Sequence, residues 1–205
     1  MKFYLSSYKI GNEAATLQKF LTGKKIGFVP NAGDFTKADA AISERIRKED
    51  TAALNELGID VEFLDLRTYF GKKEALRAKL GELDGIWVRG GNTFALRQAM
   101  KLSGMDELLT QELINRDDFV YAGYSAAGCV LSPSLRCYQI VDHPETPYAE
   151  CTEISWDGLG LIDYAFMPHF DSNHHESADI DKEIRLCEEK DIPYKAIRDG
   201  EVLIF

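Results

Sequence analysis

The chain reads Phe119-Val-Tyr-Ala-Gly-Tyr-Ser-Ala-Ala-Gly-Cys-Val130 at its most informative stretch. An apolar run typical of a buried strand passes into a turn around Ser125, and small residues that can open a helix follow. A turn this tight requires small side chains on both sides of the serine, which Gly123, Ala127 and Gly128 provide. The pattern indicates a nucleophile elbow, although Ala127 replaces the second glycine of the strict GxSxG form.

A second segment, Gly85-Ile-Trp-Val-Arg-Gly-Gly-Asn-Thr-Phe-Ala-Leu-Arg97, has the same order of strand, glycine turn, capping residue and helix. Sites of doubly wound sheets lie at the carboxyl ends of strands, so the two turns should lie at one sheet edge. The main-chain amide of Ala126 can donate to an oxyanion there, and the amide of Gly90 or Gly91 could supply the second donor.

Short apolar runs alternate with longer segments of helical period, which predicts an α/β fold with a mostly parallel sheet in a three-layer α/β/α arrangement. A single domain spanning residues 1–205 is expected. The predicted strands lie at residues 3–5, 26–30, 61–66, 85–88, 119–122, 137–141, 165–167, 195–197 and 202–205. The predicted helices lie at residues 13–21, 72–80, 93–102, 106–114 and 177–190.

Two local features add detail to this fold prediction. Ile42, Ile46, Ala53 and Leu57 share one helical face, which should pack on the sheet, and the following glycine ends that helix. Asp199-Gly200 is typical of a hairpin turn and should join the last two strands.

The charge balance restricts the partners of the protein. Lys and Arg number 24 against 34 Asp and Glu, giving a formal net charge of -10. An acidic chain without a basic block repels phosphate backbones and anionic lipid, so neither nucleic acid nor membrane is an expected partner. The four cysteines match no metal or redox spacing, and no window approaches a membrane span. A cytoplasmic protein that acts on a small substrate is expected, and a homodimer remains compatible with the sequence.

A serine nucleophile needs a base, and His169 is the best placed of the four histidines because it directly follows an apolar strand. His143, His174 and His175 lie in polar loops and should be exposed. A metal site built from His169, Asp171, His174 and His175 is conceivable, but the spacing matches no recurrent ligand pattern such as HExxH. No metal and no cofactor are therefore expected.

Several motifs together resemble peptidase E, the α-aspartyl dipeptidase family, over about residues 1 to 200. They occur in the family's order: Gly90-Gly-Asn-Thr-Phe94, Gly123-Tyr-Ser-Ala-Ala-Gly128, Pro133 with Arg136, Gly158-Leu-Gly-Leu161 and Pro168-His-Phe170. The resemblance implies a fold like that of class I glutamine amidotransferases, with serine in place of cysteine at the elbow.

The same resemblance implies roles for individual residues. Ser125 would be the nucleophile, His169 the general base, and the amides of Gly91 and Ala126 the oxyanion hole. The substrate would be a dipeptide with an N-terminal aspartate, whose side chain Arg136 would bind.

The acidic member of the triad is the residue on which this chain departs from the family. The family's acid follows the serine by about 15 residues, where this chain has Ile140. An offset of two residues selects Asp142, which is the expected acid. The alternatives are other carboxylates on the same connection or just after the histidine: Glu145, Glu150, Glu153 and Asp171.

Three other interpretations compete with a serine dipeptidase. A serine amidase or hydrolase acting on another small amide would use the same residues, and a non-catalytic binding domain could share the fold. Cys129 is disfavoured as a nucleophile, because it lies inside the predicted helix, where a thiol usually packs.

Overall fold

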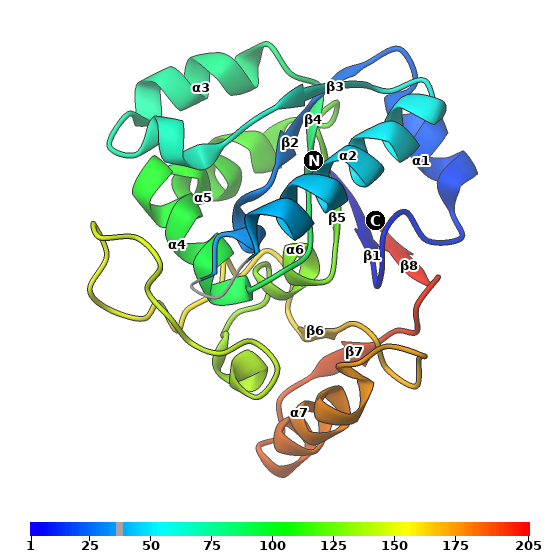
Figure 1. The fold of residues 1–205 in the computed structure, drawn as a ribbon, viewed down its shortest axis with the longest axis vertical. Helices are drawn as coiled ribbons and strands as arrows, with labels where there is room; N and C mark the ends of the chain where they lie inside the picture. The colour runs from blue at the N-terminus through cyan, green and yellow to red at the C-terminus, as the bar shows by residue number, and fades with distance from the viewer. Residues whose placement is uncertain (36–38) are drawn as a thin grey trace.

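A six-stranded sheet forms the centre of the protein in this computed structural model, which describes residues 1–35 and 39–205 (Figure 1). The strand order is β3 (Asp60–Phe63), β2 (Lys25–Val29), β4 (Gly85–Val88), β5 (Val120–Tyr124), β1 (Lys2–Ser6) and β8 (Val202–Ile204). Only β8 is antiparallel to its neighbour among these described strands. Every residue of β4 and β5 is buried, as in parallel strands covered on both faces. The predicted α/β fold with a mostly parallel sheet is confirmed.

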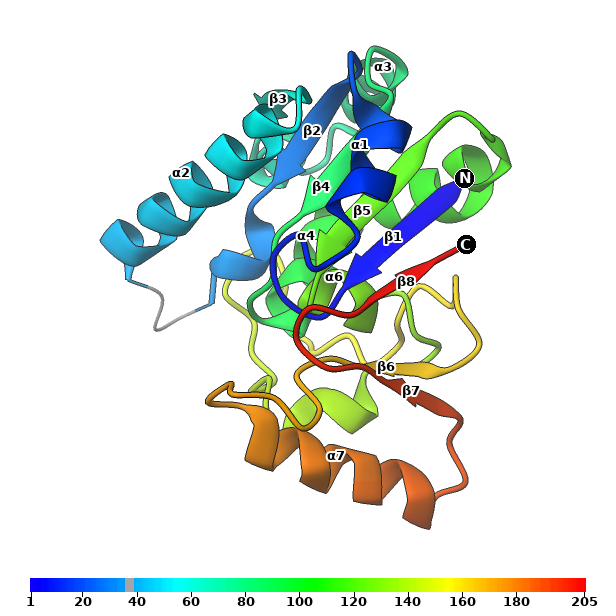
Figure 2. The same cartoon turned by 90° about the vertical axis from the view of Figure 1, so that its right-hand side faces the viewer.

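Helices cover both faces of this sheet (Figure 2). On one face α1 (Ala14–Leu21) and α2 (Ala40–Glu56) pack on strand side chains that include Trp87. The other face is covered by α3 (Lys73–Gly81), α4 (Thr93–Ser103), α5 (Met105–Glu107) and α6 (Ala126–Cys129). The predicted helix at 106–114 divides into α5, a π-helical turn (Leu108–Glu112) and a 3₁₀ turn (Leu113–Asn115).

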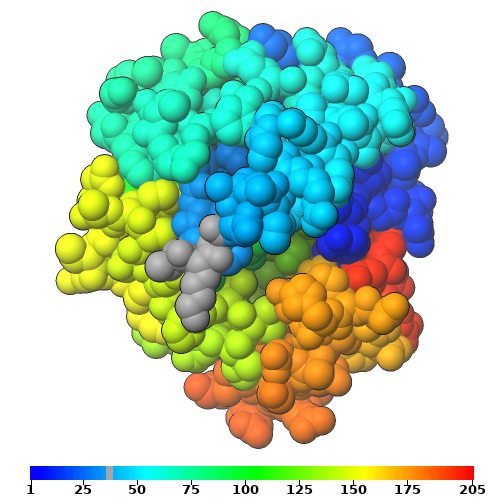
Figure 3. Space-filling view, viewed as in Figure 1, coloured from blue at the N-terminus to red at the C-terminus, as the bar shows by residue number. Residues whose placement is uncertain are grey.

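Helix α2 packs on the sheet through only part of the face predicted for it. Leu54 is buried and Ile46, Ala53 and Leu57 are partly buried, whereas Ile42 is 49% exposed. The reason is that the N-terminal half of α2 extends past the strands (Figure 2). Figure 3 shows a recess beside this half of the helix, where green strand-end residues lie between the blue of α2 and the orange of the chain near residue 175.

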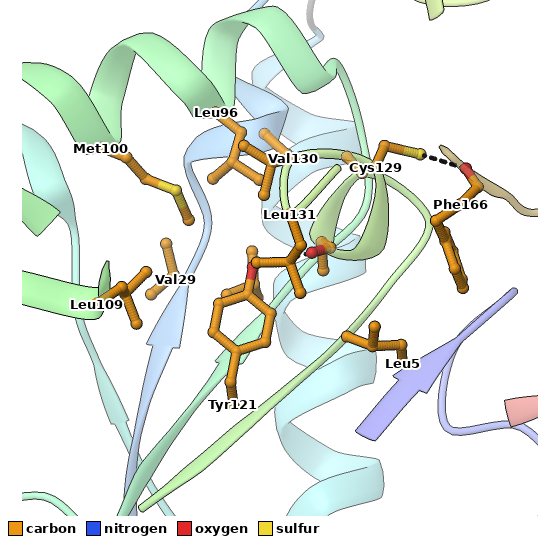
Figure 4. Packing of buried hydrophobic residues seen from close by; sticks show 14 of the residues in the cluster. Leu5, Val29, Leu96, Met100, Leu109, Tyr121, Cys129, Val130, Leu131 and Phe166 are labelled. Atoms are coloured by element: carbon orange, nitrogen blue, oxygen red, sulfur yellow. Dashed lines mark hydrogen bonds between the residues drawn. The ribbon is translucent and has the colours of Figure 1, made fainter. Parts of the chain in front are cut away.

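The larger core lies between the sheet and α4 (Figure 4). Val29 and Tyr121 reach it from neighbouring parts of the sheet, and Leu96 and Met100 reach it from α4. Tyr121 is fully buried, and its hydroxyl donates to the carbonyl oxygen of Ala127 at 2.9 Å. This bond ties the strand to the first turn of α6, because a buried hydroxyl requires a partner.

The C-terminal third forms a second layer across the carboxyl ends of the strands. β6 (Ala165–Met167) pairs in parallel with β7 (Tyr194–Ala196), and α7 (Ser177–Glu189) connects them. β8 joins the main sheet instead, so the expected hairpin at Asp199-Gly200 is wrong: the strands on its two sides belong to different sheets. Among the described residues, no helix has the length and apolar character needed to cross a membrane.

The predicted strand at 137–141 is also wrong, since a 3₁₀ turn (Arg136–Gln139) occupies that position. The amides of Ile140 and Val141 do not join a sheet. They donate to Oε1 of Glu183 at 3.2 and 3.0 Å, which anchors α7 to this turn. Glu183 is fully buried, and burial raises the pKa of its carboxyl group to about 8.

This buried carboxyl group should make the stability of the fold depend on pH. An acid whose pKa is raised by folding keeps its proton in the folded state. The unfolded chain therefore ionises first, and the free energy of unfolding falls as the pH rises from about 4.5 to about 8. Glu183→Gln keeps an acceptor for the two amides and cannot ionise. We compare the melting temperature of this variant with that of the wild type at each pH. The difference should shift in favour of the variant by at least about 3 °C from pH 5 to pH 9.

The measurement is thermal unfolding of both proteins across this pH range. Glu189→Gln serves as the matched control, because Glu189 is an exposed residue of the same helix. A difference between Glu183→Gln and the wild type that stays constant with pH would show that Glu183 does not control this dependence.

Candidate active site

Ser125 occupies a strained turn between β5 and α6. Its φ and ψ are 52° and -112°, values that a residue with a side chain rarely adopts. Hydrogen bonds hold this turn: the amide of Ser125 donates to the carbonyl oxygen of Ser6 at 3.1 Å, and that of Gly128 donates to the carbonyl oxygen of Ser125 at 2.8 Å. Gly123 lies so close to the carbonyl oxygen of Val88 that no Cβ would fit. The backbone has the geometry that the sequence predicts for an elbow.

A cavity of about 550 Å³ opens above Ser125, in the recess seen in Figure 3. Its walls come from the carboxyl ends of β1, β4 and β5, from the N-terminal half of α2 and from the chain after β6. The lining residues with polar groups are Tyr8, Lys9, Asp39, Ser43, Arg89, Gly90, Gly91, Tyr124, Ser125, His169, His174, His175 and Glu176. Phe35, Ile42 and Ile46 add an apolar wall. The structure therefore brings Ser125 and His169 to one cavity.

His169 is only 2% exposed and is held by two contacts from distant parts of the chain. Its Nδ1 lies 2.7 Å from Oδ1 of Asp199, and its main-chain amide donates to Oγ of Ser7 at 2.8 Å. The Ser7 hydroxyl in turn donates to the same Asp199 oxygen at 2.8 Å. His169 has a positive φ of 61°, so this bond network holds the histidine in an uncommon backbone conformation.

The carboxylate beside His169 thus belongs to Asp199 and not to the expected Asp142. Oδ2 of Asp142 accepts a hydrogen bond from the amide of Thr93 at 2.9 Å, at the N-terminus of α4. Burial raises the pKa of Asp142 to about 7. The position of Asp142 has a local cause, because the first amides of a helix need acceptors.

The alternative acids also lie elsewhere. Asp171 forms an ion pair with Arg198 at 2.6 Å. Glu150 and Glu153 are exposed, and the main-chain oxygen of Glu145 accepts from Gln98 at 2.5 Å. Within residues 1–35 and 39–205, the only carboxylate that hydrogen-bonds the His169 ring is that of Asp199. Its sequence signal, an Asp-Gly pair just after a strand, indicated a turn and concealed this role.

The imidazole of His169 is kept neutral by its surroundings. Burial lowers its pKa, and the Asp199 carboxylate opposes this shift only in part. The ring of His174 stacks on it at 3.7 Å with planes 7° apart, and burial lowers the pKa of His174 to about 4. His174 is therefore half-buried, contrary to the exposed position expected for it. His143 and His175 are exposed as predicted.

Glu176 is the second carboxylate near His169, with Oε2 at 3.8 Å from Nε2. His169, His174 and Glu176 have ligand atoms within 4.8 Å of one another, so this group could approach a metal ion. Two imidazoles stacked face to face direct their ring lone pairs along parallel planes and not toward a shared point. One ring would have to turn before an ion could bind, so the stacked arrangement is not a preformed metal site.

Gly91 and Ala126, the two residues expected to form an oxyanion hole, come from different turns. Gly91 has a φ of 145° and lines the cavity, and Ala126 directly follows Ser125. In the described part of the chain, neither main-chain amide donates a hydrogen bond to another protein group. Asn92 caps α4 through Oδ1, which accepts from the amide of Ala95 at 2.9 Å, and so holds the glycine turn in place.

Two residues discussed in the sequence analysis, Arg136 and Cys129, do not line the cavity. Arg136 is exposed, stacks on the ring of Trp156 at 4.9 Å and does not line the cavity, so its role in substrate binding stays a prediction. Cys129 is buried, and its sulfur lies 3.5 Å from the carbonyl oxygen of Phe166 (Figure 4). Burial raises the pKa of the Cys129 thiol well above its usual value, which makes it a poor nucleophile.

The titration of His169 tests this arrangement directly. We expect an imidazole pKa below 6.5 by NMR, because burial outweighs the Asp199 carboxylate. Asp199→Asn should lower that pKa further, since it removes the negative charge that favours the imidazolium. Asp142→Asn is the matched control and should leave it unchanged, although Glu176, His174, His175 and Tyr8 also face the ring. A pKa that responds to Asp142→Asn alone would contradict the assignment.

Comparison with known proteins finds similarity to peptidases. The model of peptidase family S51 matches residues 7–205. An uncharacterized peptidase of Listeria innocua is 33% identical over 152 residues, which cover 74% of this chain and 67% of that protein. Peptidase E of Streptomyces coelicolor is 30% identical over 195 residues, which cover 92% of this chain and 71% of that protein.

Two solved structures share the architecture. The crystal structure of a peptidase E candidate from Listeria monocytogenes EGD-e superposes with a TM-score of 0.74 at 26% identity, covering 100% of this chain and 97% of that one. A peptidase from an acI-B1 actinobacterium superposes with a TM-score of 0.61 at 15% identity, covering 100% of this chain and 82% of that one, which shows a common fold.

Proposed function

Because the chain belongs to peptidase family S51 and is a peptidase, we propose that it hydrolyses short peptides through a Ser125, His169 and Asp199 triad. The observation that carries this proposal is the 2.7 Å contact between Asp199 and His169, because His169 lines the same cavity as the strained Ser125. A buried histidine with one nitrogen on a carboxylate and a serine on the same cavity is the arrangement of a triad.

Each residue then has a defined role in the reaction. Ser125 Oγ attacks the peptide carbonyl carbon, and His169 Nε2 takes the hydroxyl proton. Asp199 keeps the other proton on Nδ1 and stabilises the imidazolium. His169 returns the first proton to the leaving amine as the peptide bond breaks. Water, activated by the same histidine, then hydrolyses the acyl-enzyme and releases Ser125.

The oxyanion of each tetrahedral intermediate needs donors in fixed positions. The amides of Gly91 and Ala126 are the proposed donors, because they flank Ser125 on two sides of the turn. Ser125 Oγ and His169 share no hydrogen bond among the described residues. Catalytic hydrogen bonds of this kind often tighten only when substrate binds.

We further propose that the substrates are short peptides with a free N-terminus and an acidic first residue. The cavity is recessed between α2 and the chain after β6, and a volume of about 550 Å³ suits a dipeptide better than a folded protein. The cationic side chain of Arg89 lines it, which favours a negatively charged residue beside Ser125.

Substitutions in the triad should remove activity without unfolding the protein. We expect Ser125→Ala to reduce dipeptide hydrolysis by several orders of magnitude and Asp199→Asn to reduce kcat by about 10³ to 10⁴. The double variant of Ser125→Ala and His169→Ala should lose little more than either change alone, because the two residues act together. Asp142→Asn is the control and should retain activity within a few-fold.

The readouts are steady-state hydrolysis and labelling by a serine-directed phosphonate. Wild-type activity in Ser125→Ala, or the absence of labelling in an active wild-type protein, would refute the serine mechanism. A larger loss in Asp142→Asn than in Asp199→Asn would refute the assignment of the acid.

Specificity is tested by kcat/KM for Asp-Leu, Glu-Leu, Asn-Leu and Ala-Leu. We expect Asp-Leu or Glu-Leu to exceed the neutral dipeptides by at least about tenfold, because one charge-assisted contact contributes about 1.5 to 3 kcal/mol. N-acetylated Asp-Leu should be a poor substrate. A flat profile would reject the acidic preference and leave the serine peptidase assignment in place.

A further inference from the structure

Arg89, the residue after β4, is a buried cation with no carboxylate partner in the part of the chain that the structure describes. It is 5% exposed, and its Nε donates to the carbonyl oxygen of Gly90 at 3.1 Å. Among the residues that the structure describes, no carboxylate lies within 4 Å of its guanidinium. Removing a charge from water is unfavourable, so buried arginines are usually paired. An unpaired one at a cavity wall points to a ligand that supplies the charge.

The guanidinium lies at the junction of two hollows. It lines the Ser125 cavity and also a neighbouring cavity of about 550 Å³, and Phe35 and Ser43 line both as well. Gly33 provides the space for it, because a Cβ at that position would come within 2.6 Å of Nη1. The side chain is therefore seated in a fixed position, close to both the glycine turn and the elbow.

The carboxylates that line these two cavities are all engaged elsewhere. Asp39 caps α2, Glu44 pairs with Arg47, and Glu176 faces the three histidines. Asp34 is 3.3 Å from Arg67 and accepts hydrogen bonds from Tyr148 and Asn31.

Lys9, the other cationic residue that lines the Ser125 cavity, is paired with carboxylates. Lys9 lies 2.5 Å from Asp50 and 3.7 Å from Glu49. Arg89 is thus the positive charge of this cavity that has no described counter-charge, and its Nη donors are the groups free to bind an anion.

We propose that Arg89 binds a carboxylate group of the peptide substrate, an inference that rests on the proposed serine peptidase function. A planar guanidinium can grip a carboxylate with two parallel hydrogen bonds. That carboxylate belongs either to the side chain of the first residue or to the C-terminus of the leaving residue. Both have the same chemistry, and the substrates below separate them.

The first experiment compares kcat/KM of the wild type and Arg89→Met on the 4-nitroanilides of Asp, Asn and Ala. The Asp compound carries a carboxylate only in its side chain. If Arg89 binds that group, Arg89→Met lowers kcat/KM for the Asp compound by about 10- to 100-fold and leaves the Asn and Ala compounds within about threefold. Arg89→Lys should recover part of the loss, because it restores the charge without the planar fork.

A second pair of substrates tests the other source. Ala-Ala carries a C-terminal carboxylate and Ala-Ala amide does not. A selective loss on Ala-Ala in Arg89→Met assigns Arg89 to the C-terminus of the peptide. Arg136→Met is the matched control, since Arg136 is exposed outside the cavity, and it should change no substrate by more than about twofold. Equal losses on substrates with and without a carboxylate would overturn the proposal.

Stability measurements separate binding from a structural role. Removing an unpaired buried charge should leave the melting temperature of Arg89→Met equal to or above that of the wild type. A melting temperature lowered by more than about 4 °C would show that Arg89 supports the fold, and would also overturn the proposal.

A binding measurement keeps the test independent of turnover. In the Ser125→Ala background, millimolar aspartic acid α-amide or alanine, each with a single carboxylate, should raise the melting temperature, and the added Arg89→Met change should abolish that rise. Failure of the wild type to cleave any substrate would refute the proposed function alone, and the binding result would still decide the role of Arg89. Absence of a rise with either compound would refute carboxylate binding.

Discussion

The Ser7 hydroxyl forms the hydrogen bonds that join the main sheet to the second sheet. Ser7 is the residue after β1. Its hydroxyl accepts a hydrogen bond from the amide of His169 after β6 and donates one to Asp199 in the segment before β8. One fully buried hydroxyl thus ties the second sheet to the edge of the first. Because an unpaired buried hydroxyl is unfavourable, each of these two hydrogen bonds favours the contact between the three segments.

His169 and Asp199 follow β6 and β7 of the second sheet, whereas Ser125 and the glycine turn lie at the carboxyl-end edge formed by the parallel strands of the main sheet. Their carboxyl ends face one side, and there each strand must turn into a helix or loop. The turn after β4 and the last part of β5 contain glycines because neighbouring backbone leaves no room for a Cβ at Gly91 or Gly123. The packing of the sheet therefore constrains the main chain on both sides of the cavity that Ser125 lines.

Charge in this protein has to be considered locally. The chain is strongly acidic, yet the cavity contains a guanidinium with no described counter-charge and two imidazoles that burial keeps neutral. Asp142 and Glu183, two carboxyl groups with raised pKa values, serve as acceptors for main-chain amides near the same edge. This local charge leaves an acidic peptide compatible with the site, although the net charge of the chain is -10.

Sequence alone determined the features that depend on neighbouring residues. Steric crowding at a tight turn selects small residues, so the elbow at Ser125 and the glycine turn at Gly90 and Gly91 are visible in the chain, as is the alternation of strand and helix. The tertiary structure decided which residues from distant parts of the sequence come into contact. Asp199 and Ser7 are 192 positions apart in the sequence. The Asp-Gly pair that predicts a hairpin locally becomes a partner of His169, because its flanking strands join different sheets.

Asp142 shows the converse. Its sequence distance from Ser125 suggested a triad acid, but its carboxylate accepts a hydrogen bond from the amide of Thr93. Hydrogen-bond partners at long range follow strand pairing, and strand pairing is settled by the burial of the whole sheet and not by any local pattern.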